Sequence, residues 1–183
     1  MASPEEPADP DGPPRAVMVA AIAVAVAAVV GILVVAAIHV KTPEQRPVAI
    51  VAIPAPQADG GACRALLDAL PARLGDYDRA AVAQPAPAGA AAWRPNADGD
   101  PVILRCGLDR PTDFVAGTPV QMVDDVAWFH IADTGRTTWI TVDRPVYVAL
   151  TLPDGSGPTP IQSISAAVAK AMPAVAVNPG PAR

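Results

Sequence analysis

The sequence predicts an α+β domain held on an N-terminal transmembrane helix, and three observations lead to this prediction. Residues 16–38 form an uncharged apolar run. The rest of the chain places segments with the period-two alternation of β-strands between two amphipathic helical segments. Two cysteines fall on the apolar faces of a predicted helix and a predicted strand. The expected architecture is an antiparallel sheet packed against two helices, with one disulfide.

Residues 16–40 are predicted to form a transmembrane helix surrounded by membrane lipid. A bilayer core takes about 20 apolar helical residues to cross, and this run is long enough with some tilt. A cleaved signal peptide is the alternative, because Val35-Ala36-Ala37 resembles a cleavage site. The run exceeds the usual 7–15 residues of a signal-peptide core, which favours an uncleaved anchor. Residues 1–15 are acidic and proline-rich, and we expect them to be disordered.

Two features give opposite indications of the domain's side of the membrane. Arg15 precedes the span, whereas Lys41 and Arg46 follow it, which slightly favours a cytoplasmic C-terminal domain. A pair of cysteines in a tethered domain favours the other side, because disulfides persist outside the cytoplasm. We expect a single-pass protein of the cell membrane, with a cytoplasmic N-terminus and an extracytoplasmic C-terminal domain.

The first elements after the span have weak sequence signals. Residues 41–60 read as a linker, in which 48–53 fits either an edge strand or a stalk. Residues 62–74 predict a helix that Pro71 kinks or ends. The spacing i, i+3, i+4, i+7 and i+11 places five residues on its apolar face: Cys63, Leu66, Leu67, Leu70 and Leu74. Residues 84–101 read as a loop, whose Trp93 is expected to pack on the core.

Strand patterns dominate the second half of the domain, which is expected to span residues 61–173. In the strand that starts at Pro101, alternate residues up to Cys106 share one face. The clearest hairpin turns at residues 133–136. Its predicted register pairs Phe129 with Ile140, His130 with Trp139, and Ile131 with Thr138.

A further strand and a second helix complete the predicted domain. In the strand over 146–152, Val148 and Leu150 lie on one face and Tyr147 on the other. Thr159 and Pro160 are typical of a helix start, and Pro173 ends the helix. Residues 174–183 are expected to be a disordered tail.

The two cysteines, Cys63 and Cys106, allow one intramolecular pair. We expect a disulfide that joins the first helix of the domain to the sheet. The closed loop of about 40 residues is worth roughly 4 kcal/mol in the chain-entropy description. The alternative is two buried free thiols in a cytoplasmic domain.

Five stretches follow the N-terminal span in a characteristic order: CRALLDALPARL, AAAW, PVILRCG, VAWF and TTWITVDRPVYVALTLP. In these stretches the chain resembles an actinobacterial membrane-anchored family, the domain of unknown function 3515. The stretches cover most of residues 60–152, and RPNADGD between Trp93 and Pro101 is longer than is usual in the family. The resemblance implies an anchored, extracytoplasmic domain in an actinobacterium, and it implies no activity.

Few residues in the sequence point to chemistry. The net charge of −5 disfavours nucleic-acid binding, which needs a basic surface. The only histidines are His39 and His130, too few for a zinc site with the two cysteines paired. No nucleophile motif is present, and the aspartates at 98, 100, 124 and 125 read as solvated turns without calcium-loop spacing. We therefore predict no catalytic residue, no metal and no cofactor, and an enzyme is the less favoured interpretation.

One cluster of aromatic residues suggests a binding face. Trp128, His130, Trp139 and Tyr147 are predicted to share the side of the sheet away from the aliphatic residues. Exposed aromatic residues often anchor partners, so one hypothesis is that this face binds an envelope protein or a glycan. The favoured interpretation is that the linker or residues 84–100 cover it as a second small core, because aromatic residues in small sheets mostly serve packing. The sequence favours an interaction or accessory module of the cell envelope, with a small-molecule-binding protein or a hydrolase using dispersed carboxylates as the second interpretation.

Overall fold

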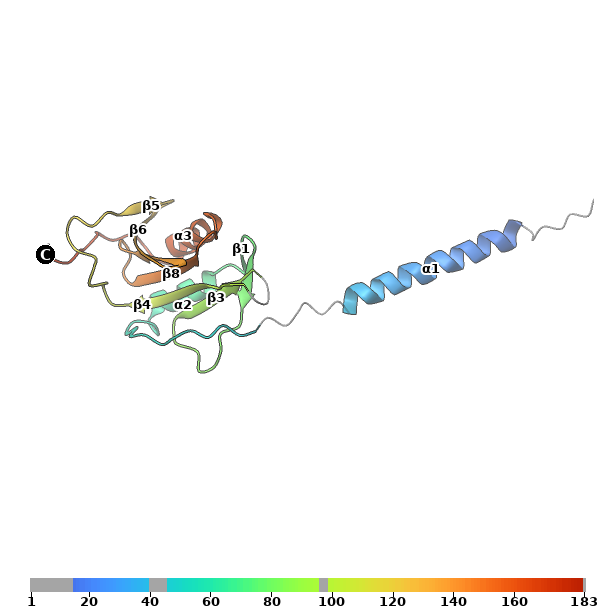
Figure 1. The fold of residues 1–183 in the computed structure, drawn as a ribbon, viewed down its shortest axis with the longest axis horizontal. Helices are drawn as coiled ribbons and strands as arrows, with labels where there is room; N and C mark the ends of the chain where they lie inside the picture. Colours follow the sequence, from blue (N-terminus) through green and yellow to red (C-terminus); the bar gives the residue numbers. More distant parts are fainter. Residues whose placement is uncertain (1–14, 40–45, 96–98, 183) are drawn as a thin grey trace, which may run out of the picture. The chain divides into compact units, whose positions relative to one another are not determined.

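A computed structural model describes residues 15–39, 46–95 and 99–182 of the chain (Figure 1). The chain divides into two compact units, residues 1–43 and 44–183. The first unit contains α1, Arg15–His39. Its window Ala16–Leu33 is apolar on all sides and none of it is buried, so α1 is long and apolar enough to cross a membrane, a test that a signal sequence also passes. The predicted disordered tail, apart from Arg15, lies outside the described residues.

The second unit is built on an antiparallel sheet of eight strands, as the α+β prediction requires. Along the sheet the order is β1-β2-β3-β4-β8-β7-β6-β5. Every neighbouring pair is antiparallel, so the sheet forms from hairpins and one return of β8 beside β4. The strands are β1 (Arg73–Leu74), β2 (Tyr77–Ala80), β3 (Ala90–Arg94), β4 (Val102–Leu108), β5 (Gln121–Val123), β6 (Val126–Asp133), β7 (Arg136–Thr141) and β8 (Tyr147–Pro153).

Two helices, α2 (Gly61–Ala69) and α3 (Thr159–Ala171), pack beside each other against the sheet (Figure 1). Leu66 of α2 and Ile164 of α3 are fully buried, and both belong to one hydrophobic core with Leu104 and Leu150 of the central strands. This arrangement confirms the predicted antiparallel sheet packed against two helices. It follows from the sequence because each helix has one apolar stripe, and this stripe packs on the sheet face that carries Leu104, Val148 and Leu150.

The first helix of the domain is shorter than the predicted 62–74. α2 ends at Ala69, and Leu70 is already extended with φ −65° and ψ 134°. Pro71 ends the helix because proline lacks the N–H and crowds the preceding turn. Leu74 therefore belongs to β1 and not to the helix, although its side chain is fully buried as its apolar character requires.

The composition indicated that residues 84–101 form a loop. This prediction is wrong, because β3 lies within them and pairs with β2 and β4. Trp93 of β3 is fully buried, so the expected packing on the core is confirmed for this side chain. Its indole N–H donates to the carbonyl of Pro71 at 3.0 Å, and the guanidinium of Arg79 lies 4.7 Å from its ring centre. An Ala-Ala-Ala-Trp strand carries little intrinsic β-preference, so neighbouring strands determine its conformation.

The predicted disulfide is present between Cys63 of α2 and Cys106 of β4. The two Cα atoms lie 5.6 Å apart, and both residues have an exposed fraction of 0%. The bridge fastens the first helix of the domain to a central strand, 43 residues further along the chain.

The expected linker packs against the domain over part of its length. Val48 forms a single parallel bridge with Val82 and is buried. At the other end of the segment, Ala58 lies between Gly89 and Gly107, and the N–H of Gln57 donates to the carbonyl of Gly107 at 3.1 Å. Gly107 has φ +92°, a conformation in which a side chain would also meet the backbone of residues 57 and 58.

The residues after α3 are extended and hydrogen-bonded, which differs from the expected frayed tail. The N–H of Val175 donates to the carbonyl of Asp143 at 2.8 Å. Gly180 exchanges two hydrogen bonds with the segment before β5, through its N–H to Phe114 and its carbonyl to Ala116. The prolines of this segment favour extended backbone, and its polar groups find partners on the domain.

Candidate functional site

The structure separates the four residues of the predicted aromatic face. His130 and Trp139 are cross-strand neighbours on β6 and β7, with ring centres 4.7 Å apart. This pairing, like the rest of the predicted hairpin register, is confirmed. Trp128 is fully buried beneath α3, where its indole N–H donates to the hydroxyl of Ser165 at 3.0 Å. Tyr147 packs with the second hydrophobic cluster, on the other face of the sheet.

The register between β7 and β8 explains this separation. Trp139 lies opposite Leu150, so the two tryptophans share the face that carries Val148, Leu150 and the helices. Tyr147 directly precedes Val148 and therefore points to the opposite face. The turn between β7 and β8 has no sequence pattern that fixes the register. The prediction that Trp128 and Trp139 share a face with Tyr147 is therefore wrong. Whether His130 and Trp139 contact a partner remains a prediction.

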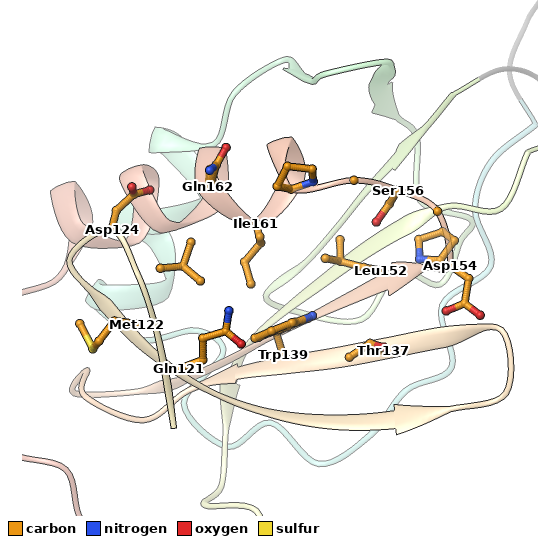
Figure 2. Close-up of a pocket in the computed structure, with 15 residues that line it drawn as sticks. Gln121, Met122, Asp124, Thr137, Trp139, Leu152, Asp154, Ser156, Ile161 and Gln162 are labelled. Carbon is orange, nitrogen blue, oxygen red and sulfur yellow. The ribbon is translucent and has the colours of Figure 1, made fainter. Parts of the chain in front are cut away.

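A cleft opens where the sheet extends beyond the start of α3 (Figure 2). We call it the α3 cleft; its volume is about 520 Å³. The β5–β6 hairpin, the β7–β8 pair and the first turn of α3 contribute its walls. It is lined by Gln121, Met122, Val123, Asp124, Thr137, Trp139, Leu152, Pro153, Asp154, Gly155, Ser156, Gly157, Pro158, Ile161 and Gln162.

Apolar side chains form the floor of the α3 cleft. Trp139, Leu152 and Ile161 come from two strands and one helix and point toward a common centre in Figure 2. Trp139 is half-buried. The indole N–H groups of Trp93 and Trp128 donate to protein acceptors. That of Trp139 has no such acceptor among the described residues, so it is available to a bound molecule.

Polar side chains surround this floor. Gln121 lies beside Trp139, Gln162 lies on α3 across the cleft from it, and Asp124 and Asp154 lie at opposite ends of the cleft (Figure 2). Among the described residues that line it, none is Lys, Arg, His or Cys. The two carboxylates without a facing cation disfavour an anionic ligand and favour a neutral or cationic one.

A buried arginine fixes the end of the cleft that carries Asp124. Arg144 is 6% exposed and donates to the carbonyl of Asp125 at 2.6 Å. It also donates to the carbonyl of Asp143 at 2.9 Å and forms an ion pair with that carboxylate at 3.0 Å. The β5–β6 turn, in which Asp124 has a φ of +50°, is therefore held to the turn that follows β7.

The described residues show no group of three His, Cys, Asp or Glu side chains arranged to hold a metal ion. Of the four aspartates that the sequence placed in turns, Asp98 lies outside the described residues. Asp124 lines the α3 cleft and Asp100 lines a smaller hollow of about 210 Å³ on the other side of β8. The α3 cleft itself had no sequence signal, because its lining comes from three separate parts of the chain that only the fold brings together.

One family model, described as protein of unknown function (DUF3515), matches residues 22–177. The chain belongs to the DUF3515 family. The match includes most of α1, all eight strands of the sheet and both α2 and α3, so the family model covers the apolar helix as well as the sheet. No curated protein and no solved structure matches the chain.

Proposed function

We propose that this DUF3515 protein is a single-pass membrane protein that presents residues 46–182 outside the cytoplasm as an interaction module of the cell envelope. The observation that carries the proposal is a buried disulfide, Cys63–Cys106, in a domain that follows a helix of membrane-spanning length. A disulfide of this kind is typical of oxidising compartments, and glutathione or thioredoxin would keep the thiols reduced in the cytoplasm.

We further propose that the partner contacts the α3 cleft. An apolar floor with a few convergent polar groups is the usual composition of a binding site. The half-buried Trp139 supplies a large apolar surface and an unused donor, a combination that is common at the centre of interfaces. His130 contacts Trp139 and is exposed, so part of the predicted aromatic face adjoins the cleft.

A small-molecule carrier is the second candidate, and the volume of the α3 cleft favours it. Small-molecule sites usually enclose about 300–1,000 Å³. The geometry gives less support to a hydrolase. Asp124 and Asp154 lie at the two ends of the cleft, and no histidine lies among the described lining residues to activate Ser156.

Maleimide labelling of Cys63 and Cys106 in intact cells tests the compartment. We expect no labelling until a reductant is added, because the thiols are paired. A cell-impermeant maleimide should then label both residues without permeabilisation of the membrane. Labelling that requires permeabilisation but no reductant would show a cytoplasmic, reduced domain and would refute the proposed location.

Photocrosslinking in living cells tests the contact site. In the test variant a photoreactive residue replaces Met122, which is 60% exposed and lines the cleft. In the control the same residue replaces Val51, which is 77% exposed on the linker. We expect a discrete adduct from position 122 that Trp139→Ala abolishes. Equal adducts from both positions, or an adduct that Trp139→Ala leaves unchanged, would refute the α3 cleft as the contact site.

A further inference from the structure

The outer edge of β6 is only partly covered by its neighbour. β5 pairs with Val126, Ala127 and Trp128, and the ladder ends where Gln121 meets Trp128. Continuing the register would place Pro119 opposite His130, and proline has no N–H to donate. The part of β6 from residue 129 to 133 therefore has no strand partner on this side among the described residues.

The direction of the free backbone groups follows from the ladder with β7. The carbonyl of Ala127 accepts from the N–H of Val142 at 2.9 Å, so the polar groups of Ala127 face β7. Successive residues of a strand direct these groups to opposite sides. The N–H and C=O groups of His130 and Ala132 therefore point outward from the open edge, and both residues are exposed.

This edge is continuous with the α3 cleft. Gln121, the last paired residue of β5, lines the cleft, and His130, the next outward-facing residue of β6, contacts Trp139 on the cleft floor. In an antiparallel or parallel ladder, directly paired residues direct their side chains to the same face. A chain paired beside His130 would thus place alternate side chains next to His130 and Trp139, at the mouth of the cleft.

We propose that the β6 edge at His130–Ala132 and the α3 cleft together bind an extended peptide segment of an envelope protein, which adds to the sheet as a further strand. This inference rests on the proposed role of the α3 cleft as the contact site. Backbone pairing holds the peptide, and the cleft selects its side chains, as in other cases of strand addition. An apolar side chain fits over Trp139, Leu152 and Ile161.

The charge of the site specifies the peptide further. Asp124 and Asp154 line the cleft, and the described lining contains no Lys or Arg. Residues 46–182, which the proposal places outside the cytoplasm, contain 10 Lys or Arg and 13 Asp, a net charge of −3. A segment with a Lys or Arg on each side of its apolar residue complements the two carboxylates, whereas an acidic segment is repelled.

The test uses the full chain in lipid nanodiscs and a displayed library of random 12-residue peptides. We expect enrichment of peptides that carry an apolar residue flanked by Lys or Arg. A synthetic copy of one selected peptide is then N-methylated at one backbone position at a time, which removes one donor without changing the protein. Methylation should weaken binding about tenfold at alternate positions and leave the positions between them unaffected, because only every second N–H faces β6.

Two variants of Ala132 test the same pairing from the side of the protein. Ala132→Pro removes the outward N–H, and proline is tolerated where an edge N–H faces solvent. Ala132→Val keeps the N–H and is the matched control. We expect Ala132→Pro to weaken the selected peptide about tenfold and Ala132→Val to leave its affinity within twofold.

The possible results separate this inference from the proposed function. A selected peptide that binds without an alternating effect of N-methylation, and equally well to Ala132→Pro, refutes strand addition. If Trp139→Ala still abolishes its binding, the α3 cleft stands as a contact site. If no peptide is enriched and glycan fragments bind to the same nanodiscs, the inference is also overturned, and the envelope ligand is a glycan.

Discussion

Replacing Gly107 by alanine tests how the segment before α2 is held on the sheet. A Cβ atom at this position would lie 2.5 Å from the Cα of Ala58 and 2.5 Å from the carbonyl carbon of Gln57. Both neighbours are backbone atoms, so the segment has to move away. The positive φ of +92° adds a second penalty for any residue with a side chain.

Gly117→Ala separates the two penalties. Gly117 has nearly the same φ, +90°, but a Cβ there would meet nothing within 4 Å. A positive φ costs an alanine about 1–2 kcal/mol, of which about 0.4–1 kcal/mol is offset because alanine restricts the unfolded chain. We expect Gly117→Ala to lower the free energy of unfolding by about 1 kcal/mol.

Gly107→Ala should lower the free energy of unfolding by about 3 kcal/mol. The difference is one backbone hydrogen bond, from Gln57 to Gly107, worth about 1 kcal/mol, and the burial of the Ala58 methyl group, worth about 0.8 kcal/mol. Urea unfolding of residues 44–183 measures the stability, and hydrogen exchange of the Gln57 amide measures the displacement. Equal stability losses in the two variants, with unchanged protection of Gln57, would refute the argument that close backbone approach holds this segment.

Three further predictions concern the core and its titration. Replacing Cys63 and Cys106 together by alanine should lower the free energy of unfolding by about 4 kcal/mol, from the 43-residue separation, as measured in urea; a loss below 1 kcal/mol would contradict the loop-closure estimate. Trp128→Phe should cost about 2–3 kcal/mol because it leaves the buried Ser165 hydroxyl without its donor, and adding Ser165→Ala should restore about 1 kcal/mol; no recovery in the double variant would exclude this cause. Burial, and then the charges of Asp76 and Asp100, raise the pKa of Tyr77, so the folded state keeps the phenol proton at a pH where the unfolded state has lost it. The free energy of unfolding should therefore decrease as the pH rises above about 10, the ordinary pKa of tyrosine. This decrease should be smaller in Tyr77→Phe, when unfolding curves of both proteins are recorded at pH 8 and above about pH 10.

The sequence was informative wherever a local pattern decides the structure. The β6–β7 hairpin has a short turn between strongly alternating strands, so the pairing of His130 with Trp139 could be predicted. With only two cysteines, the disulfide had one possible connectivity. The apolar run, the start of α3 at Thr159 and the end of α2 before Pro71 also follow from local rules.

Features that depend on distant parts of the chain could not be predicted in this way. β3 has an alanine-rich sequence and exists because β2 and β4 lie on both sides of it. The side of the sheet on which Trp139 lies relative to Tyr147 depends on the β7–β8 register, which no turn motif fixes. The α3 cleft requires the first turn of α3 to lie near Trp139 and Gln121, which come from distant parts of the chain and meet only after folding.

The disulfide also determines how the domain bears mechanical force. A pull transmitted along residues 46–58 reaches α2 at its first turn, and at Cys63 it crosses the sulfur bridge into β4, in the interior of the strand order. Residues 64–105 are enclosed by that bridge, so α2 beyond Cys63 and strands β1–β3 carry none of the tension. At about 3.5 Å per extended residue, the bridge withholds roughly 150 Å of chain. Under tension, residues 64–105 therefore add no length while the bridge is oxidised, and they become extensible when it is reduced.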